Sequence, residues 1–383
     1  MAGKAVFIAG RVANPEVSGW LPDHAVVTEG DRIVEVARRS ALPSDIGESH
    51  TVHDLGDVSL MPGMVEVHTH MHCSTTLDAY ELVTTEDDQR LSMRAARNVR
   101  DALLSGVTTM RDLGSKNEVA FPVRDAVRAG VIPGPRLLLA GTPVTTTAGH
   151  CHMFGTEADT LEEVVTAVRR QKKLGADVIK MMATGGMFTP TANPRTPQYP
   201  VETLRAAVEE AERLDMSIAI HIANGNAENV RLYGLRPGTH PAAGFGIFRV
   251  PTVAACMYLI LGDISTQFPD LRWGFIEASS QWIPWIHQEA ARRLQAAGKE
   301  IPDSLFEANN IFVTCQVDED IPWIIKYAGD NCLVIGTDYG HNDPSSDIDA
   351  LSLLRDRDDI DAETKERILL RNPSTLFGID LAA

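Results

Sequence analysis

The chain has 383 residues, of which 44% are hydrophobic and 23% are charged, and this ordinary globular composition excludes disordered, collagen-like and coiled-coil proteins. It contains 35 Lys and Arg residues against 52 Asp and Glu residues, so its formal net charge is −17. That charge has the wrong sign for a protein that binds nucleic acid or an acidic membrane surface. We therefore expect neither as a partner, and we expect a small molecule as the substrate.

The cysteines and the apolar segments predict a cytoplasmic protein. Five cysteines without a CxxC pair are expected to be reduced thiols, because a chain of this length needs no disulfide in order to fold. The longest apolar segment, which starts at Val250, has about half of the length that a membrane span requires. The first residues lack the apolar region of a signal peptide.

The first 57 residues predict a small β-domain. Short apolar runs alternate there with turn residues, and residues 24–37, HAVVTEGDRIVEVA, predict a hairpin that turns at Gly30 and Asp31. No segment of helical period interrupts this part of the chain.

From residue 58 to residue 383, β-branched runs alternate with segments of helical period, a pattern typical of βα units around a parallel sheet. Eight such units predict a (β/α)8 TIM barrel of the α/β class, which divides the chain into a β-domain over 1–57 and a barrel over 58–383. Catalytic groups of such barrels lie at the carboxyl ends of the strands. The eight strands are predicted near residues 58–68, 106–112, 136–141, 177–182, 217–222, 271–277, 311–315 and 333–338.

Capping residues predict where several helices begin. Thr160 with Glu163 forms a capping box, and the helix that it starts is expected to end at Gly175. Pro200 precedes a second helix, and Thr85 is predicted to start a third. Further helices are expected over 282–297, 318–328 and 361–370.

The first predicted barrel strand ends in MVEVHTH, which contains His68 and His70. Residues two apart on a strand point to the same face, so both imidazoles can bind one metal ion in the mouth of the barrel. A single buried histidine is usually a hydrogen-bonded core residue. Two histidines at this spacing and at this place predict a metal-binding pair.

The fourth predicted strand encloses Lys180 between Val178, Ile179, Met181 and Met182. A lysine in such apolar surroundings is costly, because its ammonium group loses its hydration. Three explanations are open: an amine that acts as a base or Schiff-base nucleophile, a lysine carbamylated by carbon dioxide that bridges two metal ions, or a side chain that extends to solvent at the strand end.

Two more strands carry a polar residue of the same kind. His221 lies in the apolar strand SIAIHI, and Asp338 ends the eighth predicted strand, LVIGTD. A carboxylate at that place can ligate a metal and accept a proton from the water that the metal polarises. Each residue alone has a structural explanation, as a core histidine or a helix cap, but with the histidine pair and Lys180 on the same rim they predict a metal site.

Taken together, these residues resemble the amidohydrolase superfamily. MPGMVEVHTHMH carries its histidine pair after a PG turn, GADVIKMMATGG carries its strand-four lysine, and His221 and Asp338 match its fifth- and eighth-strand ligands. The N-terminal β-domain is similar to the small sandwich of these enzymes. The resemblance implies one or two divalent metal ions, a metal-bound hydroxide as the nucleophile, and Asp338 as the proton shuttle. Zinc is the expected metal, with manganese or iron as alternatives, and Lys180 would be carbamylated and bridging in a two-metal site.

The resemblance changes near residue 222. Residues 1 to about 222 resemble metal-dependent dipeptidases and imidazolonepropionase-like members, and His150 in TTTAGHCHM matches a histidine that contacts the scissile group of the substrate. Residues from about 223 to 383 resemble the amidohydrolase-related decarboxylases. This change predicts a natural mosaic or a constructed fusion.

Glu277, in RWGFIEASS, stands where the two-metal members of the superfamily carry a strand-six histidine. Glutamate can ligate zinc or manganese, or it can act as an acid or base in a one-metal site. It can also simply accept a hydrogen bond from a loop amide.

Three functions are open on the sequence alone. We expect a metal-dependent amidohydrolase that cleaves an amide or related C–N bond of a small molecule. The alternatives are a metal-dependent non-oxidative decarboxylase of an aromatic or unsaturated acid, and a non-catalytic or fused barrel. The residues expected to act in catalysis are Asp338, His150 and Glu277, and those expected to bind metal are His68, His70, Lys180, His221 and Asp338.

The length predicts an incomplete β-sandwich. The dipeptidase-like enzymes return to their sandwich after strand eight, whereas few residues follow the last predicted helix here. We therefore expect an exposed β edge that is covered by a partner chain or protected by its own charges, and a homo-oligomer is one way to cover it.

Overall fold

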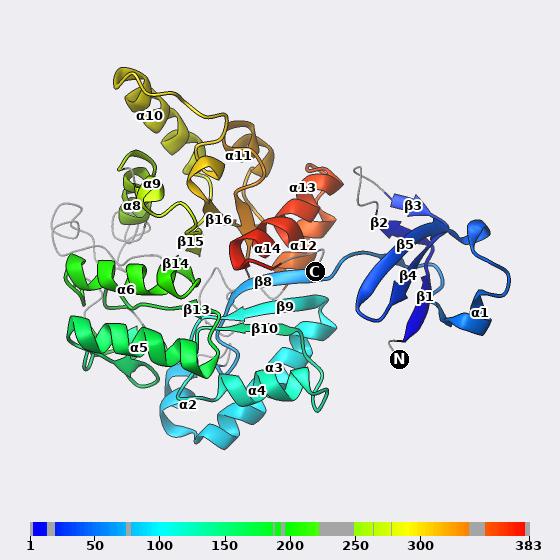
Figure 1. The fold of residues 1–383 in the computed structure, drawn as a ribbon, viewed down its shortest axis with the longest axis horizontal. Helices are drawn as coiled ribbons and strands as arrows, with labels where there is room; N and C mark the ends of the chain where they lie inside the picture. The colour runs from blue at the N-terminus through cyan, green and yellow to red at the C-terminus, as the bar shows by residue number, and fades with distance from the viewer. Residues whose placement is uncertain are drawn as a thin grey trace. The chain divides into compact units, whose positions relative to one another are not determined.

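The computed structural model describes residues 3–13, 20–73, 78–186, 188–192, 196–221, 249–262, 264–276, 278–336 and 349–379, with the backbone alone for Ser217–His221. The chain divides into two compact units, which we describe separately (Figure 1). Unit 1 comprises Met1–Gly63 with Asp358–Glu366, and unit 2 comprises Met64–Arg357 with Arg367–Ala383.

Unit 1 contains a four-stranded sheet in the order β5-β4-β1-β6 and a three-stranded sheet in the order β3-β2-β7. The predicted hairpin is confirmed: β4 and β5 pair antiparallel, and Gly30 between them has φ +64°, a value that glycine adopts readily. The strands are β1 (Lys4–Ile8), β2 (Arg11–Ala13), β3 (Trp20–Pro22), β4 (His24–Glu29), β5 (Arg32–Arg38), β6 (Thr51–Asp54) and β7 (Ser59–Leu60). The short helices are η1 (Arg39–Ala41), α1 (Ile46–Ser49) and α13 (Ala362–Glu366).

The larger sheet of unit 1 is apolar on one side and exposed at both edges. Val6, Ile8, Ala25 and Val27 from β1 and β4 form its buried core. The outer strand β6 is exposed at all four of its residues, and most of β5 is exposed as well. Charged residues along β5 suit an uncovered edge, because they oppose pairing with another strand.

In the part of unit 2 that the structure describes, two parallel sheets contain the eight strands predicted from the sequence, which are thereby confirmed. Three of them form a sheet in the order β10-β9-β8, and five form a sheet in the order β13-β14-β15-β16-β17. They are β8 (Met64–Thr69), β9 (Val107–Asp112), β10 (Arg136–Leu139), β13 (Val178–Ile179), β14 (Ser217–His221), β15 (Trp273–Ile276), β16 (Ile311–Cys315) and β17 (Leu333–Ile335). A small parallel pair is formed by β11 (Val144–Thr145) and β12 (Thr156–Glu157).

The two parallel sheets meet at both of their edges. At one edge, the backbone N–H of Asp177 donates to the carbonyl of Leu139 at 2.8 Å, so β13 begins beside β10. At the other edge, β17 lies against β8. A Cβ on Gly336 would approach Val67 Cγ2 to 2.9 Å, which explains why a glycine follows β17.

Helices alternate with the strands of unit 2. Those before β15 are α2 (Ala79–Thr85), α3 (Asp88–Leu104), α4 (Ala120–Arg128), α5 (Leu161–Leu174), α6 (Val201–Arg213), α8 (Val250–Leu261) and α9 (Ile264–Gln267). Those after it are α10 (Ile283–Ala296), η3 (Glu307–Asn309), α11 (Ile321–Ala328), α12 (Ala350–Asp356), the π-helical turn η4 (Arg367–Arg371) and α14 (Asn372–Phe377). Figure 1 shows α5 and α6 side by side and α3 and α4 next to β9 and β10.

The predicted helix starts are confirmed with one exception. The capping box of Thr160 and Glu163 is present in α5, and Gly175 ends that helix with φ +86°. Thr85 does not start α3, because it is the last residue of α2 and its hydroxyl donates to the carbonyl of Glu81 at 2.7 Å. Asp87 caps α3 instead, and its carboxylate accepts a hydrogen bond from the backbone N–H of Arg90 at 2.8 Å.

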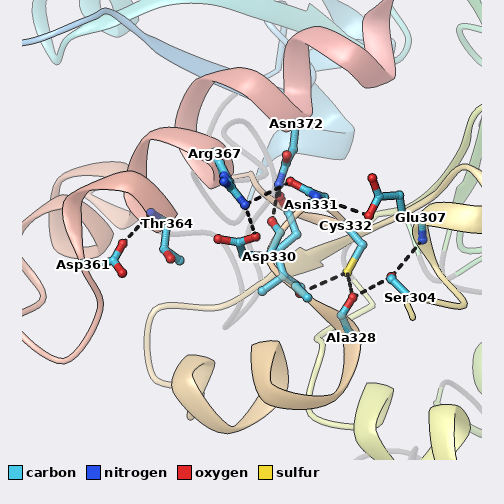
Figure 2. Close-up of polar contacts among 12 residues, drawn as sticks. Ser304, Glu307, Ala328, Asp330, Asn331, Cys332, Asp361, Thr364, Arg367 and Asn372 are labelled. Carbon is cyan, nitrogen blue, oxygen red and sulfur yellow. Dashed lines mark hydrogen bonds and ion pairs between the residues drawn. The ribbon is translucent and has the colours of Figure 1, made fainter. Parts of the chain in front are cut away.

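The helices near the C-terminus hold the beginning of β17 in place (Figure 2). The side-chain amide of Asn372 donates to the carbonyls of Asp330 at 2.6 Å and Leu333 at 2.7 Å. Arg367 pairs with the carboxylate of Asp330 at 2.5 Å. These contacts fix the last strand and therefore the edge that lies against β8.

All five cysteines are free and buried, as predicted for reduced thiols. Among the described residues, no helix is both long and apolar enough to span a membrane.

Candidate metal centre at the strand ends

Two histidines lie at the carboxyl end of β8. His68 is in the strand and His70 follows its last residue, and the two are 0% and 5% exposed. Their Nε2 atoms are 3.3 Å apart. The two-residue period of the strand therefore brings both rings to the same place in the buried interior.

A specific hydrogen bond orients the ring of His70, and another holds the backbone of His68. His70 Nδ1 lies 2.9 Å from the carbonyl oxygen of Gly114. Because a carbonyl can only accept, Nδ1 donates, and in the neutral imidazole Nε2 then keeps its lone pair. On the strand itself, the carboxylate of Glu66 accepts a hydrogen bond from the backbone N–H of His68 at 2.8 Å.

Asp112 is a buried acid beside the histidine pair that the sequence analysis did not single out. It ends β9, the strand that pairs with β8, and it is 0% exposed. Burial raises the pKa of its carboxyl to about 6, although hydrogen bonds from Met71, Gly114 and Ser115 oppose the rise. Its position in the sequence could have indicated it, because Asp112 is an acid that ends an apolar strand at the carboxyl side of a parallel sheet.

Arg111 and Glu66 are two further buried charges of this region that the sequence analysis missed. Arg111 Nε donates to the carbonyl of Val67 at 2.8 Å, and its guanidinium stacks on the ring of Phe377, 4.3 Å from the centroid. Burial lowers the pKa of Arg111 to about 9, whereas the charge of Glu66 raises it. Arg111 contacts the backbone of β8 at Val67 and Glu66 contacts it at His68. Both charged side chains therefore support the strand that carries the histidines.

Lys180 follows the last residue of β13 and is 3% exposed. The explanation that its side chain extends to solvent is therefore wrong. Its carbonyl accepts a hydrogen bond from Val144 at 2.9 Å. Burial raises the pKa of the Cys151 thiol to about 12, and the charge of Lys180 opposes this rise.

A chain of contacts joins the histidine pair to Lys180. A Cβ on Gly114, whose carbonyl is 2.9 Å from His70, would lie 3.2 Å from Pro143, and the next residue, Val144, is the partner of Lys180. The ring of Phe154 lies 6.5 Å from that of His70, and Phe154 shares a buried cluster with Cys151. The histidines and the lysine are therefore joined through Gly114, Pro143 and Val144 at the same end of the strands.

His150 is half-buried in the segment that follows β11. Its backbone N–H donates to the side-chain oxygen of Gln198 at 2.5 Å, and the amide of Gln198 donates to Thr145 at 2.9 Å and to the Met182 carbonyl at 2.7 Å. A Cβ on Gly186 would lie 2.3 Å from both Cε1 and Nε2 of the imidazole. The ring thus fits against the backbone of Gly186, six residues beyond Lys180 in the sequence.

Three predicted site residues fall outside what the structure describes. They are Glu277, Asp338 and the side chain of His221, whose backbone ends β14 opposite Ile276 of β15. Within the described ranges, no group of three or more His, Cys, Asp and Glu side chains is arranged to hold a metal ion.

The described residues nevertheless fit a divalent metal. In a tetrahedral zinc site with Zn–N bonds of about 2.0–2.1 Å, two histidine nitrogens are separated by roughly 3.3–3.4 Å. The observed 3.3 Å between the Nε2 atoms of His68 and His70 agrees with this spacing. Hydrogen bonding of Nδ1, as in His70, is the usual way in which proteins orient a metal-binding imidazole.

The mixed α/β fold carries paired histidines and a buried lysine at the ends of its parallel strands. The model of the Amidohydrolase family matches residues 59–259, which is more than half of the chain, and the chain belongs to this family.

Curated relatives agree with this assignment over part of their length. Ochratoxinase from Aspergillus niger is 33% identical over 192 residues, which cover 43% of this chain and 39% of that enzyme. A 5-methylthioadenosine/S-adenosylhomocysteine deaminase from Moorella thermoacetica is 27% identical over 261 residues, which cover 63% of this chain and 55% of that enzyme. The chain is therefore matched over about half of the length of these relatives or less.

Solved structures show the same fold along nearly the whole chain. The crystal structure of Aspergillus niger ochratoxinase has a TM-score of 0.65 at 19% identity and covers 98% of this chain and 85% of that one. A prolidase complexed with N-methylphosphonate-L-proline has a TM-score of 0.63 at 20% identity and covers 99% of this chain and 88% of that one.

Proposed function

We propose that this protein is a metal-dependent hydrolase that cleaves an amide or related C–N bond of a small molecule. The observation that supports this most strongly is the buried pair His68 and His70, whose Nε2 atoms have the spacing of two ligands on one ion. The eight parallel strands of unit 2 would close into one (β/α)8 barrel, and residues 58–383 would form the catalytic domain.

The metal ligands in this proposal come from four strand ends. His68 and His70 would bind one ion, most suitably zinc, with manganese or iron as alternatives. Lys180, which is buried, would bridge to a second ion as a carbamate, which relieves the cost of a buried ammonium by converting it to an anion that the metals neutralise. His221 and Asp338 complete the set by the resemblance to the superfamily.

A divalent metal at this place activates water as a nucleophile and polarises the carbonyl of the substrate. His150 would donate a hydrogen bond from its imidazole to that carbonyl oxygen and stabilise the charge that develops there. Asp338 would accept the proton of the attacking water and pass it to the leaving nitrogen. Glu277 would serve as a further ligand or as an acid.

The relatives suggest which substrates to try first. An ochratoxinase and a prolidase resemble the chain, so ochratoxin and Xaa-Pro dipeptides lead the panel, followed by other N-acyl amino acids and by 5-methylthioadenosine. The assay is run with zinc, with manganese and after chelation. We expect turnover of a C–N substrate that requires metal and is lost in His68→Ala.

Hydroxybenzoates in the same panel test the decarboxylase alternative, which rests on the C-terminal half of the sequence. Release of carbon dioxide from them without hydrolysis of any C–N substrate would contradict our proposal and support the lyase. No turnover across the whole panel by metal-loaded protein would instead support a non-catalytic barrel.

A further inference from the structure

The carboxylate of Asp112 accepts hydrogen bonds from the segments that follow β8 and β9. Its Oδ2 accepts a hydrogen bond from the backbone N–H of Met71 at 2.9 Å, and its Oδ1 accepts one from Gly114 at 3.1 Å. The hydroxyl of Ser115 lies 3.0 Å from both oxygens.

Both backbone partners of Asp112 border His70. Met71 is the next residue in the chain, and the carbonyl of Gly114 is the acceptor for His70 Nδ1 at 2.9 Å. Gly114 has φ +147°, a conformation that favours glycine, and a Cβ there would lie 3.2 Å from Pro143 and 3.6 Å from His70 Cε1. The carbonyl that orients the imidazole belongs to the peptide between Gly114 and Ser115, whose N–H donates to the carbonyl of Gly141 at 2.9 Å. Asp112 restrains the residues on both sides of this peptide, through the N–H of Gly114 and the hydroxyl of Ser115.

The loop after β8 is also held from the other side. The side-chain amide of Asn98, on α3, donates to the carbonyls of Met71 and Cys73 at 2.9 Å each. Asp112 therefore makes contacts that Asn98 does not duplicate, with Gly114 and Ser115 in the segment that follows β9.

We propose that Asp112 is a positioning residue that selects the tautomer of His70. By holding Gly114, it presents the Gly114 carbonyl to His70 Nδ1–H, so Nε2 is the nitrogen left to bind metal. Contacts of this kind to a metal-binding histidine typically change metal affinity 10- to 100-fold. The inference rests on the proposed function where it concerns metal, but the tautomer is a property of the metal-free protein.

The test compares the full-length chain with Asp112→Ala and with the isosteric Asp112→Asn, which is the milder variant if the alanine variant folds poorly. The tautomer of His70 is measured in metal-free protein by long-range ¹H–¹⁵N NMR, with His70→Gln to assign its signals. Zinc affinity is measured by competition with a chromophoric chelator, and stability by urea unfolding.

Asp177→Ala is the matched control. Asp177 also has a carboxylate that accepts a backbone hydrogen bond between neighbouring strands, from Leu139 at 2.8 Å, and burial raises its pKa as well. It lies at the start of β13, however, at the opposite end from His70. Its loss should lower stability without changing the tautomer or the zinc affinity.

We expect the Nδ1–H tautomer in the wild type, a shift toward the Nε2–H tautomer in both Asp112 variants, and zinc affinity about 10- to 100-fold lower in Asp112→Ala. Asp112 variants that keep the Nδ1–H form, with stability lowered as in Asp177→Ala, would overturn the inference. If the wild type binds no zinc, the proposed function fails, and the tautomer comparison still decides the role of Asp112.

Discussion

The imidazole of His150 lies against Gly186, a residue that has no room for a side chain. In Gly186→Ala, the new Cβ would lie 2.3 Å from two ring atoms, so the ring must move. Displacing a catalytic group by about 1 Å can cost on the order of 100-fold in rate. We expect kcat/KM on the identified substrate to fall by that order, with metal content unchanged.

Gly47→Ala serves as the control for this substitution, because its Cβ would meet nothing closer than Val52 at 3.9 Å. An unchanged kcat/KM in Gly186→Ala would show that His150 does not act on the substrate.

The two hydrogen bonds that the Asn98 side chain donates are expected to stabilise the folded protein. Asn98→Ala leaves the carbonyls of Met71 and Cys73 without these donors in a buried place, and we expect the free energy of unfolding to fall by about 2 kcal/mol. The neighbouring Arg97→Ala, at a side chain that is 76% exposed, should change it by less than about 0.5 kcal/mol. Equal effects of the two variants in urea unfolding would contradict the assignment.

Among single residues, the sequence indicated those that a periodic pattern marks. It did not indicate those whose role depends on contacts with residues far away in the chain. His68 and His70 could be found because a strand alternates its faces, and Lys180 because a charge interrupts an apolar run. Asp112 and Gln198 act through hydrogen bonds to distant backbone, at Met71 and Met182 respectively, and no local pattern marks such partners.

At the scale of elements, a carboxylate joins α5 to α6. Glu210 on α6 accepts hydrogen bonds from Arg169 on α5 at 2.7 Å and from Arg213 at 2.5 Å. The two guanidinium groups, that of Arg213 first, lower the pKa of Glu210 to about 2 from its ordinary 4.5. Because the pKa is lower in the folded state, the resulting stability is fully present above pH 4.5 and is lost as the pH falls toward about 2.

Glu210→Gln should therefore lower the free energy of unfolding by about 1 kcal/mol at pH 7, since both arginines are more than half exposed and solvent screens the pairs. Urea unfolding between pH 7 and pH 2 measures the difference between variant and wild type. It should shrink below pH 4.5, and a difference that stays constant to pH 2 would contradict this explanation.

Element boundaries were predictable where the signal is local. The capping box of Thr160 and Glu163 and the glycine that follows α5 are properties of adjacent residues, and both are confirmed. The prediction that Thr85 caps α3 is wrong, because Thr85 is the last residue of the short helix α2. Asp87, two residues later, has the capping geometry. A pattern of capping residues alone does not distinguish one helix from two in succession.

At the scale of the whole molecule, unit 1 and unit 2 have different tasks in our proposal. Unit 2 carries every described candidate site residue, whereas unit 1 contributes small sheets with exposed outer strands. The change of resemblance near residue 222 stays a prediction, and the family match runs past it to residue 259. The order of the strands was predictable from the alternation of β-branched and helical segments. The contacts that join the two parallel sheets were not, because they form between residues far apart in the chain.

The most direct test of the central claim is the number of metal ions per chain, measured by mass spectrometry on purified wild type, His68→Ala and Lys180→Ala. The proposal predicts one to two ions in the wild type, loss of metal in His68→Ala, loss of the second ion in Lys180→Ala, and loss of turnover on chelation. Less than one ion per chain, together with turnover that chelators do not affect, would contradict it.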